Sequence, residues 1–160
     1  MALSPSIRRP LRRFTQVGHR RRALVAEAVT YLLLARLGLI VVPFPVLARR
    51  LGSFVPPSDP RALATRGKTA QAGIAEDVSW AVTRSARYVP FKAVCLPQAM
   101  AARVMLKRRG VPSVMHFGAA KNTTLGEDKP LDTHAWLDAA GVEVTGYPVA
   151  EKCAEIACFV

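Results

Sequence analysis

The first 26 residues contain neither aspartate nor glutamate. The basic residues of this stretch include Arg8, Arg9, Arg12, Arg13, Arg20, Arg21 and Arg22. A basic arm of this kind fits nucleic acid, an anionic membrane or an acidic protein partner, and a solvated tail is the remaining alternative. Nucleic acid is the least favoured partner, because aromatic residues that would stack on bases do not alternate with the arginines. No nucleic-acid partner is therefore predicted.

Cysteine is also scarce. Cys95, Cys153 and Cys158 are too few, and odd in number, for a disulfide framework, which makes a reducing cytoplasm the expected compartment. No pair of them has the spacing of metal ligands, so neither a metal nor a cofactor is predicted. At least one thiol is left free to react.

The chain also lacks an uninterrupted apolar run long enough to be a clear membrane span. Residues 23–47 are its most apolar part, but Glu27 and Arg36 interrupt them and Pro43 and Pro45 end them. No Ala-x-Ala cleavage site follows, which argues against a signal peptide. A spanning helix needs about 20 apolar residues. The pattern favours a helix packed on the domain, or lying on a membrane surface, over a span.

The positions of the prolines and the apolar content predict how the chain is divided into parts. Pro56, Pro57 and Pro60 predict a linker over residues 53–60, and the 51% of apolar residues predicts a globular body. The predicted parts are a basic arm, a helical segment with its linker, and one core domain, over residues 1–22, 23–58 and 59–160.

The core domain is predicted to be α+β, with helices first and a small antiparallel sheet after them. Apolar residues every four positions predict a helix over 71–88, ended by proline. Further elements are a helix from 95 to 109, strands over 113–117, 133–139, 142–147 and 156–160, a loop over 119–129, a turn at 140–141 and a short helix over 149–155.

Cys95 opens the second of these helices. Pro97 is tolerated only in a first helical turn, and Gly110 is a typical helix stop, so the cysteine lies at or next to the N-cap. The partial positive charge of a helix N-terminus favours the thiolate, which is the attacking species. His134 lies on an adjoining predicted strand, where an imidazole can act as the base. Cys153 and Cys158 have no such setting and are predicted to be structural.

Several segments resemble the leader peptidase family of lasso-peptide biosynthesis. They are Cys95-Leu96-Pro97-Gln98-Ala99, Leu106 to Pro112, Gly118, and His134-Ala135-Trp136-Leu137, with further likeness at Leu33 to Leu37, Pro43-Phe44, Trp80 to Val82 and Tyr88 to Pro90. The resemblance covers residues 23 to 160. It implies a transglutaminase-like (papain-like) core, in which a helix bearing the cysteine packs on the sheet that bears the histidine.

The resemblance also implies an activity and partners. The protein would be a cytoplasmic cysteine protease that removes the leader peptide from a ribosomally made precursor, before a lasso cyclase closes the core peptide into a ring. Cys95 would be the nucleophile and His134 its base. A separate leader-binding protein would supply recognition. Backbone N–H groups at the helix start would hold the oxyanion, with Gln98 as a further candidate donor.

The third catalytic member is where the sequence departs from the family. The family's orienting aspartate lies about twelve residues after the histidine, where this chain has Gly146. A hairpin turn at residues 140–141 would place Thr145 and Tyr147 opposite Trp136 and His134.

Two aspartates are candidates for the third catalytic member, the group that orients His134. Asp138 shares the predicted face of His134 but lies about 13 Å along the strand, and Asp132 lies about 6.5 Å before it. The two rank level, with a backbone carbonyl or Asn122 as further alternatives. His116 and His19 are predicted to be non-catalytic.

A second hypothesis uses the same fold without catalysis. The missing aspartate and the net charge of +12 favour a transglutaminase-like binding module whose basic arm contacts a partner or a membrane surface. Acyl transfer to an amine, instead of hydrolysis, is a lesser enzymatic alternative.

Overall fold

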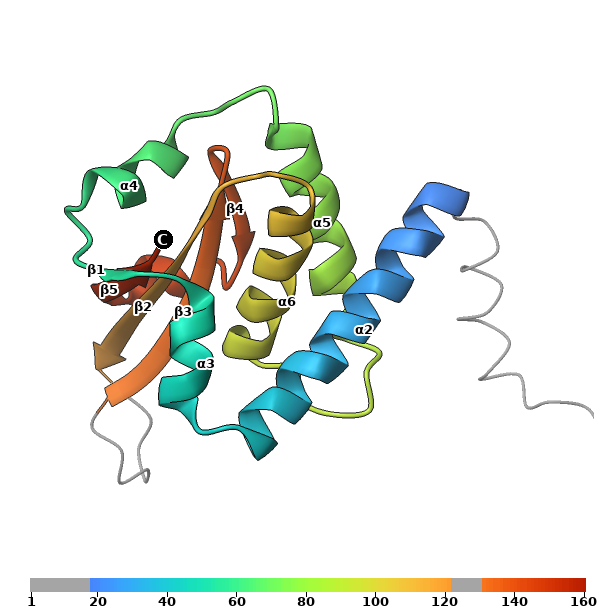
Figure 1. Ribbon diagram of the computed structural model, residues 1–160, viewed down its shortest axis with the longest axis horizontal. Coiled ribbons are helices and arrows are strands. Elements are labelled where there is room, and N and C mark those ends of the chain that lie inside the picture. The colour runs from blue at the N-terminus through green and yellow to red at the C-terminus, as the bar shows by residue number, and fades with distance from the viewer. Residues whose placement is uncertain (1–17, 122–130) are drawn as a thin grey trace, which may run out of the picture.

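The computed structural model describes residues 18–121 and 131–160, and within them the chain is α+β, as predicted (Figure 1). Its helices are α2 (His19–Val41), α3 (Phe44–Leu51), α4 (Pro60–Leu63), η1 (Ala64–Arg66), α5 (Ala72–Ser85), α6 (Cys95–Arg108) and η2 (Val149–Lys152). Its strands are β1 (Phe54–Val55), β2 (Ser113–Lys121), β3 (Leu131–Ala139), β4 (Val142–Thr145) and β5 (Ala154–Phe159).

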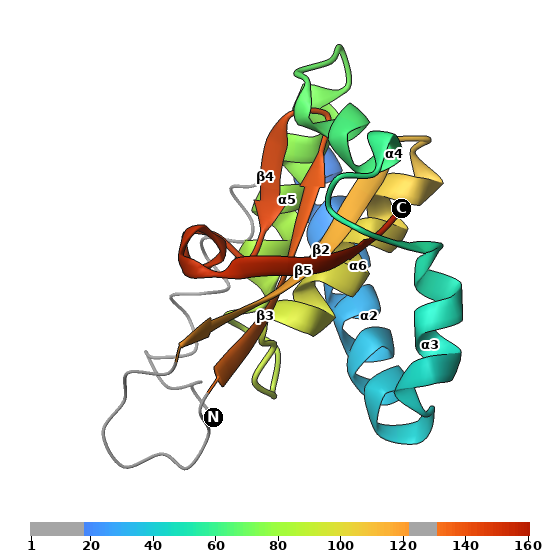
Figure 2. The same cartoon turned by 90° about the vertical axis from the view of Figure 1, so that its left-hand side faces the viewer.

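The strands form one antiparallel sheet in the order β1-β5-β2-β3-β4. Helices α2, α5 and α6 lie on one side of it, as Figures 1 and 2 show. The main core fills the space between them, and its largest fully buried side chains are Leu32, Met105, Leu106, Met115, Leu137, Val78, Val82, Val111 and Val144. On the other side of the sheet, Ala62 of α4 packs with Val114 and Cys158 in a small second core.

Helix α2 shares the main core, although the sequence predicts it as a segment separate from residues 59–160. Leu24, Ala28, Leu32 and Ala35 recur at helical spacing and are buried against the other helices. By length and composition α2 could cross a membrane, but the core helix of a soluble protein passes the same test. Only 22% of its most apolar stretch is buried, and Leu34, Leu37, Ile40 and Val41 are more than half exposed.

The stretch predicted as a linker, residues 53–60, contributes to the sheet. Its first residues form β1, which pairs with β5 at the edge of the sheet. Prolines follow directly, which suits an edge strand because proline cannot donate to a strand ladder. Asp59 then accepts a hydrogen bond from the backbone N–H of Arg61 and so caps α4.

The predicted loop over 119–129 is partly wrong. Strand β2 continues to Lys121, because Ala119 and Ala120 pair with Thr133 and Asp132 of β3. The rest of that loop lies outside the described residues. The short helix predicted over 149–155 is a 3-10 helix ending at Lys152.

The hairpin between β3 and β4 turns where predicted, but its register differs from the prediction. Ala140 (φ 53°) and Gly141 (φ 75°) both adopt left-handed backbone geometry, as a two-residue type I′ turn requires. Asp138 pairs with Glu143, whereas the next pair joins Leu137 to Thr145. One extra residue on β4 therefore forms a bulge, and Thr145 does not oppose Trp136 as the sequence predicted.

Candidate active site

Cys95 is the first residue of α6, as predicted, and it is half-buried. The N-cap position is Val94, and no side chain caps the helix. The first backbone N–H groups of a helix have no partner inside it. The start of α6 therefore combines a thiol with backbone donors that are free of a side-chain cap.

Gln98 holds the loop that leads into this helix. Its Nε2 donates to the carbonyl of Ala93 at 2.6 Å. This bond engages the side-chain amide that the sequence offered as an oxyanion donor. One N–H of the amide is thereby used and the other is not, so backbone N–H groups are the main donors at Cys95 and Gln98 stays a further candidate.

His134 lies on β3 opposite Gly118, and its ring is fixed by a backbone carbonyl. Its Nε2 is 2.7 Å from the carbonyl oxygen of Gly146. A carbonyl only accepts, so Nε2 must carry the proton of the neutral ring. The lone pair then resides on Nδ1, which is the atom that can act as a base.

Gly146 occupies the position of the family's aspartate, and no side chain fits there in this conformation. Its φ of 92° lies in the left-handed region. A Cβ atom would stand 2.6 Å from Cβ of Trp136 and 2.8 Å from the carbonyl oxygen of Ala135. The group bonded to Nε2 of His134 is thus a backbone carbonyl, which was one of the alternatives for the third member left open by the sequence, and its catalytic role stays a prediction.

The structure places Asp138 with a different histidine. Its Oδ1 accepts a hydrogen bond of 2.7 Å from the hydroxyl of Tyr147, and its Oδ2 lies 3.2 Å from Nε2 of His116. Both oxygens are thus engaged away from His134. The strand register explains this. Asp138 and His134 share one face of β3, but Asp138 lies further along the strand, beside His116.

Asp132 is exposed and lies near two cysteines. Burial raises the pKa of Cys153, and the neighbouring Cys95 and Asp132 raise it further. Cys95 and Asp132 therefore each lie near enough to Cys153 for their charges to act on it. The remaining candidate for the third member, Asn122, lies outside the described residues.

The imidazole of His134 belongs to a row of stacked rings. The indole of Trp136 lies 6.3 Å from it at 19°, and 5.4 Å from the ring of His116 at 10°. These side chains alternate with Leu137, which is in the main core beneath the helices, so the rings of His134 and Trp136 lie on the face of the sheet away from α6. No hydrogen bond within the described residues joins Cys95 to His134, so their pairing stays a prediction.

His116, which was predicted from the sequence to be non-catalytic, is 1% exposed and lies between two carboxylates. Burial opposes its charged form, but the carboxylates of Asp138 and Glu155 outweigh burial and raise the pKa of His116. A signal was present in the sequence. A histidine that alternates with Val114 on a half-buried strand occupies a position where an apolar residue is expected.

Cys158 is fully buried and donates its thiol proton to Oε1 of Glu155 at 3.4 Å. Burial and this hydrogen bond raise its pKa to about 12. Such a thiol is not a nucleophile at neutral pH.

Comparison with known proteins gives one match. A family model described as the transglutaminase-like superfamily matches residues 38–157. No curated protein and no solved structure matches the chain. The matched region holds α3 to α6 and nearly all of the sheet, including Cys95 and His134. The chain belongs to the transglutaminase-like superfamily.

Proposed function

We propose that the protein is a cysteine protease that removes the leader peptide from a ribosomally synthesised lasso-peptide precursor before macrocyclisation. The observation that carries the proposal is Cys95 at an uncapped helix N-terminus in a transglutaminase-like fold. In this proposal the base is His134, whose ring is held through Nε2 with Nδ1 as its basic atom. The choice of a lasso precursor rests on the sequence motifs around these two residues.

The proposed reaction follows the chemistry of a thiol and an imidazole. The Cys95 thiolate attacks the scissile carbonyl, and backbone N–H groups at the start of α6 hold the developing oxyanion. Protonated His134 gives its Nδ1 proton to the leaving amine, which leaves an acyl-enzyme. Nδ1 then takes a proton from water, and the resulting hydroxide attacks the thioester, which releases the acid and restores the Cys95 thiolate with protonated His134.

Gly146 gives this site an orienting group without a charge. Its carbonyl fixes the tautomer and the plane of the His134 ring. A neutral oxygen stabilises an imidazolium less than a carboxylate does. We therefore expect slower turnover than a full triad provides. In this proposal a separate leader-binding protein binds the precursor, and a cyclase acts on the peptide after cleavage.

Replacement of Cys95 tests the proposal. The Cys95→Ala variant, incubated with a precursor peptide and a leader-binding protein, should give no leader removal by mass spectrometry, because the acyl-enzyme cannot form. The Cys153→Ala variant is the matched control and should retain cleavage, since its thiol does not lie at a helix start. Cleavage by folded Cys95→Ala protein would refute the proposal.

The same assay decides the third member. Asp138→Asn and Asp132→Asn should each change cleavage less than tenfold if the Gly146 carbonyl orients His134. A triad aspartate is worth about 10⁴-fold in rate. A loss near that size in either variant would show that a carboxylate, and not the carbonyl, is the third member.

A non-catalytic binding module is the second candidate, and a surface feature favours it. Large apolar side chains on α2 and α3 are exposed, namely Leu33, Leu34, Leu37, Ile40, Val41, Phe44 and Val46. A patch of this kind commonly marks a protein or membrane contact. Binding of a precursor or of anionic vesicles by wild-type protein that never cleaves would support this candidate over the protease.

A further inference from the structure

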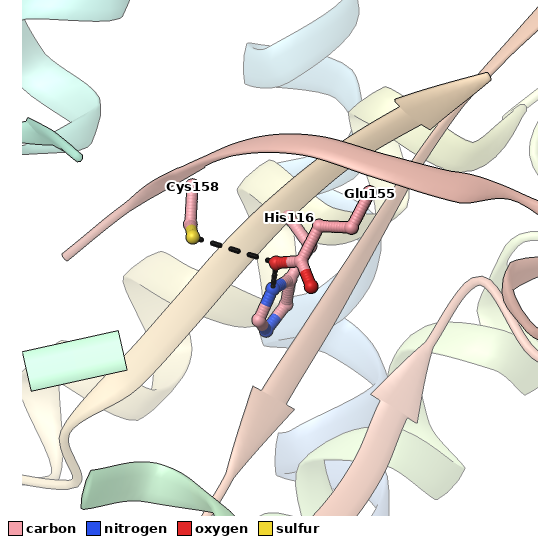
Figure 3. A group of neighbouring side chains, drawn as sticks. All are labelled: His116, Glu155 and Cys158. Atoms are coloured by element: carbon pink, nitrogen blue, oxygen red, sulfur yellow. Dashed lines mark hydrogen bonds and ion pairs between the residues drawn. The ribbon is translucent and has the colours of Figure 1, made fainter. Parts of the chain in front are cut away.

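A second group of reactive side chains lies on the sheet face away from α2, α5 and α6. It consists of His116 from β2, and Glu155 and Cys158 from β5 (Figure 3). Figure 3 shows the Glu155 carboxylate between the other two, with an interaction to each. The three ligand atoms, Nδ1, a carboxylate oxygen and Sγ, all lie within 4.8 Å of one another.

A β-bulge brings the group together. His116 pairs with Cys158 and Phe117 with Ala157, but Gly118 pairs with Glu155. Ile156 is therefore an extra residue, and it is 65% exposed. Without the bulge, Glu155 and Cys158 would point to opposite faces of the sheet, because they are three residues apart. Bulges of this kind often lie next to functional sites, where they re-aim a side chain.

The distances and atom types suit zinc. Zinc binds histidine nitrogen, cysteine sulfur and carboxylate oxygen, with bonds of about 2.0–2.3 Å. At tetrahedral angles these lengths separate a sulfur and an oxygen ligand by about 3.5 Å. Sγ of Cys158 and Oε1 of Glu155 are 3.4 Å apart. Nδ1 of His116 contacts Oε1 directly, so the imidazole and the carboxylate must move apart for an ion to bind between them.

The other ring nitrogen of His116, Nε2, also has the surroundings that a metal-binding histidine needs. Nε2 of His116 is buried and has no partner in hydrogen-bond geometry among the described residues, yet Oδ2 of Asp138 lies 3.2 Å away. Tyr147 holds that carboxylate through its hydroxyl. Metal-binding histidines generally donate their second N–H to a carboxylate, which fixes the ring. Trp136, stacked on His116 at 5.4 Å, fixes the ring plane.

A route to solvent is present too. A pocket of about 340 Å³ is lined by residues that include His116, Glu155 and Asp138. The pocket gives an ion access to His116 and Glu155, and a water molecule in it can supply a fourth ligand, whereas Cys158 is fully buried and does not line the pocket. Arg66 lies 3.7 Å from Oε2 of Glu155, the oxygen that is not shared with the cysteine.

We propose that Nδ1 of His116, Glu155 and Cys158 bind one zinc ion, with Asp138 as the partner that orients His116. Binding requires Nδ1 of His116 to be free of a proton and the Cys158 thiol to give up its proton to solvent, which leaves a thiolate–zinc bond. The ion links β2 to β5 behind the stacked ring of Trp136. From the sequence only the unusual position of His116 could be noticed, because the bulge at Ile156 is what brings Glu155 to His116 and Cys158.

Cobalt(II) binding tests the proposal, because a thiolate bound to cobalt gives a charge-transfer absorption. The full chain carrying Cys95→Ser and Cys153→Ser leaves Cys158 as the sole thiol. Titration with cobalt should produce the charge-transfer band at one equivalent, and zinc should abolish it. Asp138→Asn should keep the band but weaken binding about 10–100-fold.

Two variants each remove a proposed ligand, and a third variant is the matched control. Cys158→Ser should lose the band, and Glu155→Gln should weaken cobalt binding at least tenfold while circular dichroism stays native. Glu143→Gln removes a carboxylate that lines the same pocket without belonging to the group, and it should bind as the parent does. Absence of a one-equivalent band in the parent, or unchanged binding in folded Glu155→Gln, would overturn the proposal.

Discussion

Cys95 and Cys158 lie in settings that differ in almost every physical respect, and so do the two histidines, His134 and His116. Cys95 is half-buried at a helix start, and His134 is held by a neutral carbonyl. Cys158 is fully buried in a strand, and the neighbouring His116 is held by carboxylates. Residue type alone therefore does not determine chemistry. The first setting suits an accessible nucleophile, and the second suits a fixed ligand.

The backbone explains the division. A helix N-terminus offers unpaired N–H groups and partial positive charge, which stabilise a thiolate. A strand interior offers neither, and nearby carboxylates disfavour a second negative charge. Trp136 lies between the two histidines and packs on both. The two neighbourhoods are thus adjacent in space while their thiols remain chemically distinct.

Thiol alkylation should show the largest contrast. In Cys153→Ser protein at neutral pH, iodoacetamide should modify Cys95 and leave Cys158 unmodified, because burial and Glu155 raise the pKa of Cys158 to about 12. We expect rates that differ by at least two orders of magnitude, measured by peptide mass spectrometry over time.

Replacement of His134 sharpens that contrast. His134→Ala should slow the modification of Cys95 and leave the rate at Cys158 unchanged. A Cys95 rate that does not respond to His134 would break the comparison and favour the binding module. Unfolding in denaturant should make both thiols react alike.

Gly146→Ala should give the next largest effect. A side chain at a left-handed φ costs about 1–3 kcal/mol, and its Cβ would also press on Trp136. At about 2–4 °C per kcal/mol, the melting temperature should fall by several degrees, and cleavage should fall with it. Calorimetry and the leader-removal assay measure the two effects.

A matched glycine provides the control. Gly73 lies in α5 with no atom within 4 Å of an added Cβ, so Gly73→Ala should leave the melting temperature equal or higher. Equal stability in both variants would show that the Gly146 backbone is not constrained as described.

Much of this arrangement could be predicted from sequence, because single residues determined it. Pro97 and Gly110 delimit α6, and the turn at residues 140–141 defines the hairpin. The two bulges could not be predicted. A bulge adds one residue to a strand without a distinctive composition, yet it shifts every later pair. For that reason the partner of His134 and the grouping of Glu155 with His116 emerge only from the structure.

A perturbation at the far end of α6 should give the smallest effect. Arg109, just beyond the helix, donates to both carboxylate oxygens of Glu27 on α2, at 3.1 and 2.5 Å. This hydrogen bond lowers the pKa of Glu27 against the opposing effect of burial. Glu27→Gln should cost about 1 kcal/mol after solvent screening.

The pH dependence of that cost has a defined sign. A lowered carboxyl pKa stabilises the fold above the ordinary value of 4.5 and loses this contribution as the pH falls through the folded value. Thermal unfolding from pH 3 to 7 should show the two proteins converging at acid pH. Cobalt binding near Cys158 should be unaffected, and a change there would mean that the two neighbourhoods are coupled through α6.

The position of Trp136 has a spectroscopic consequence. Tryptophan emission responds to what touches the indole, and this indole touches both histidines. The other tryptophan, Trp80, lies on α5 beneath the guanidinium groups of Arg21 and Arg84. In a Trp80→Phe background, a single fluorophore would report events on either side of it, a bound peptide at one histidine or an ion at the other. Trp136 would thus be an intrinsic fluorescent probe for both proposed sites, the one at His134 and the one at His116.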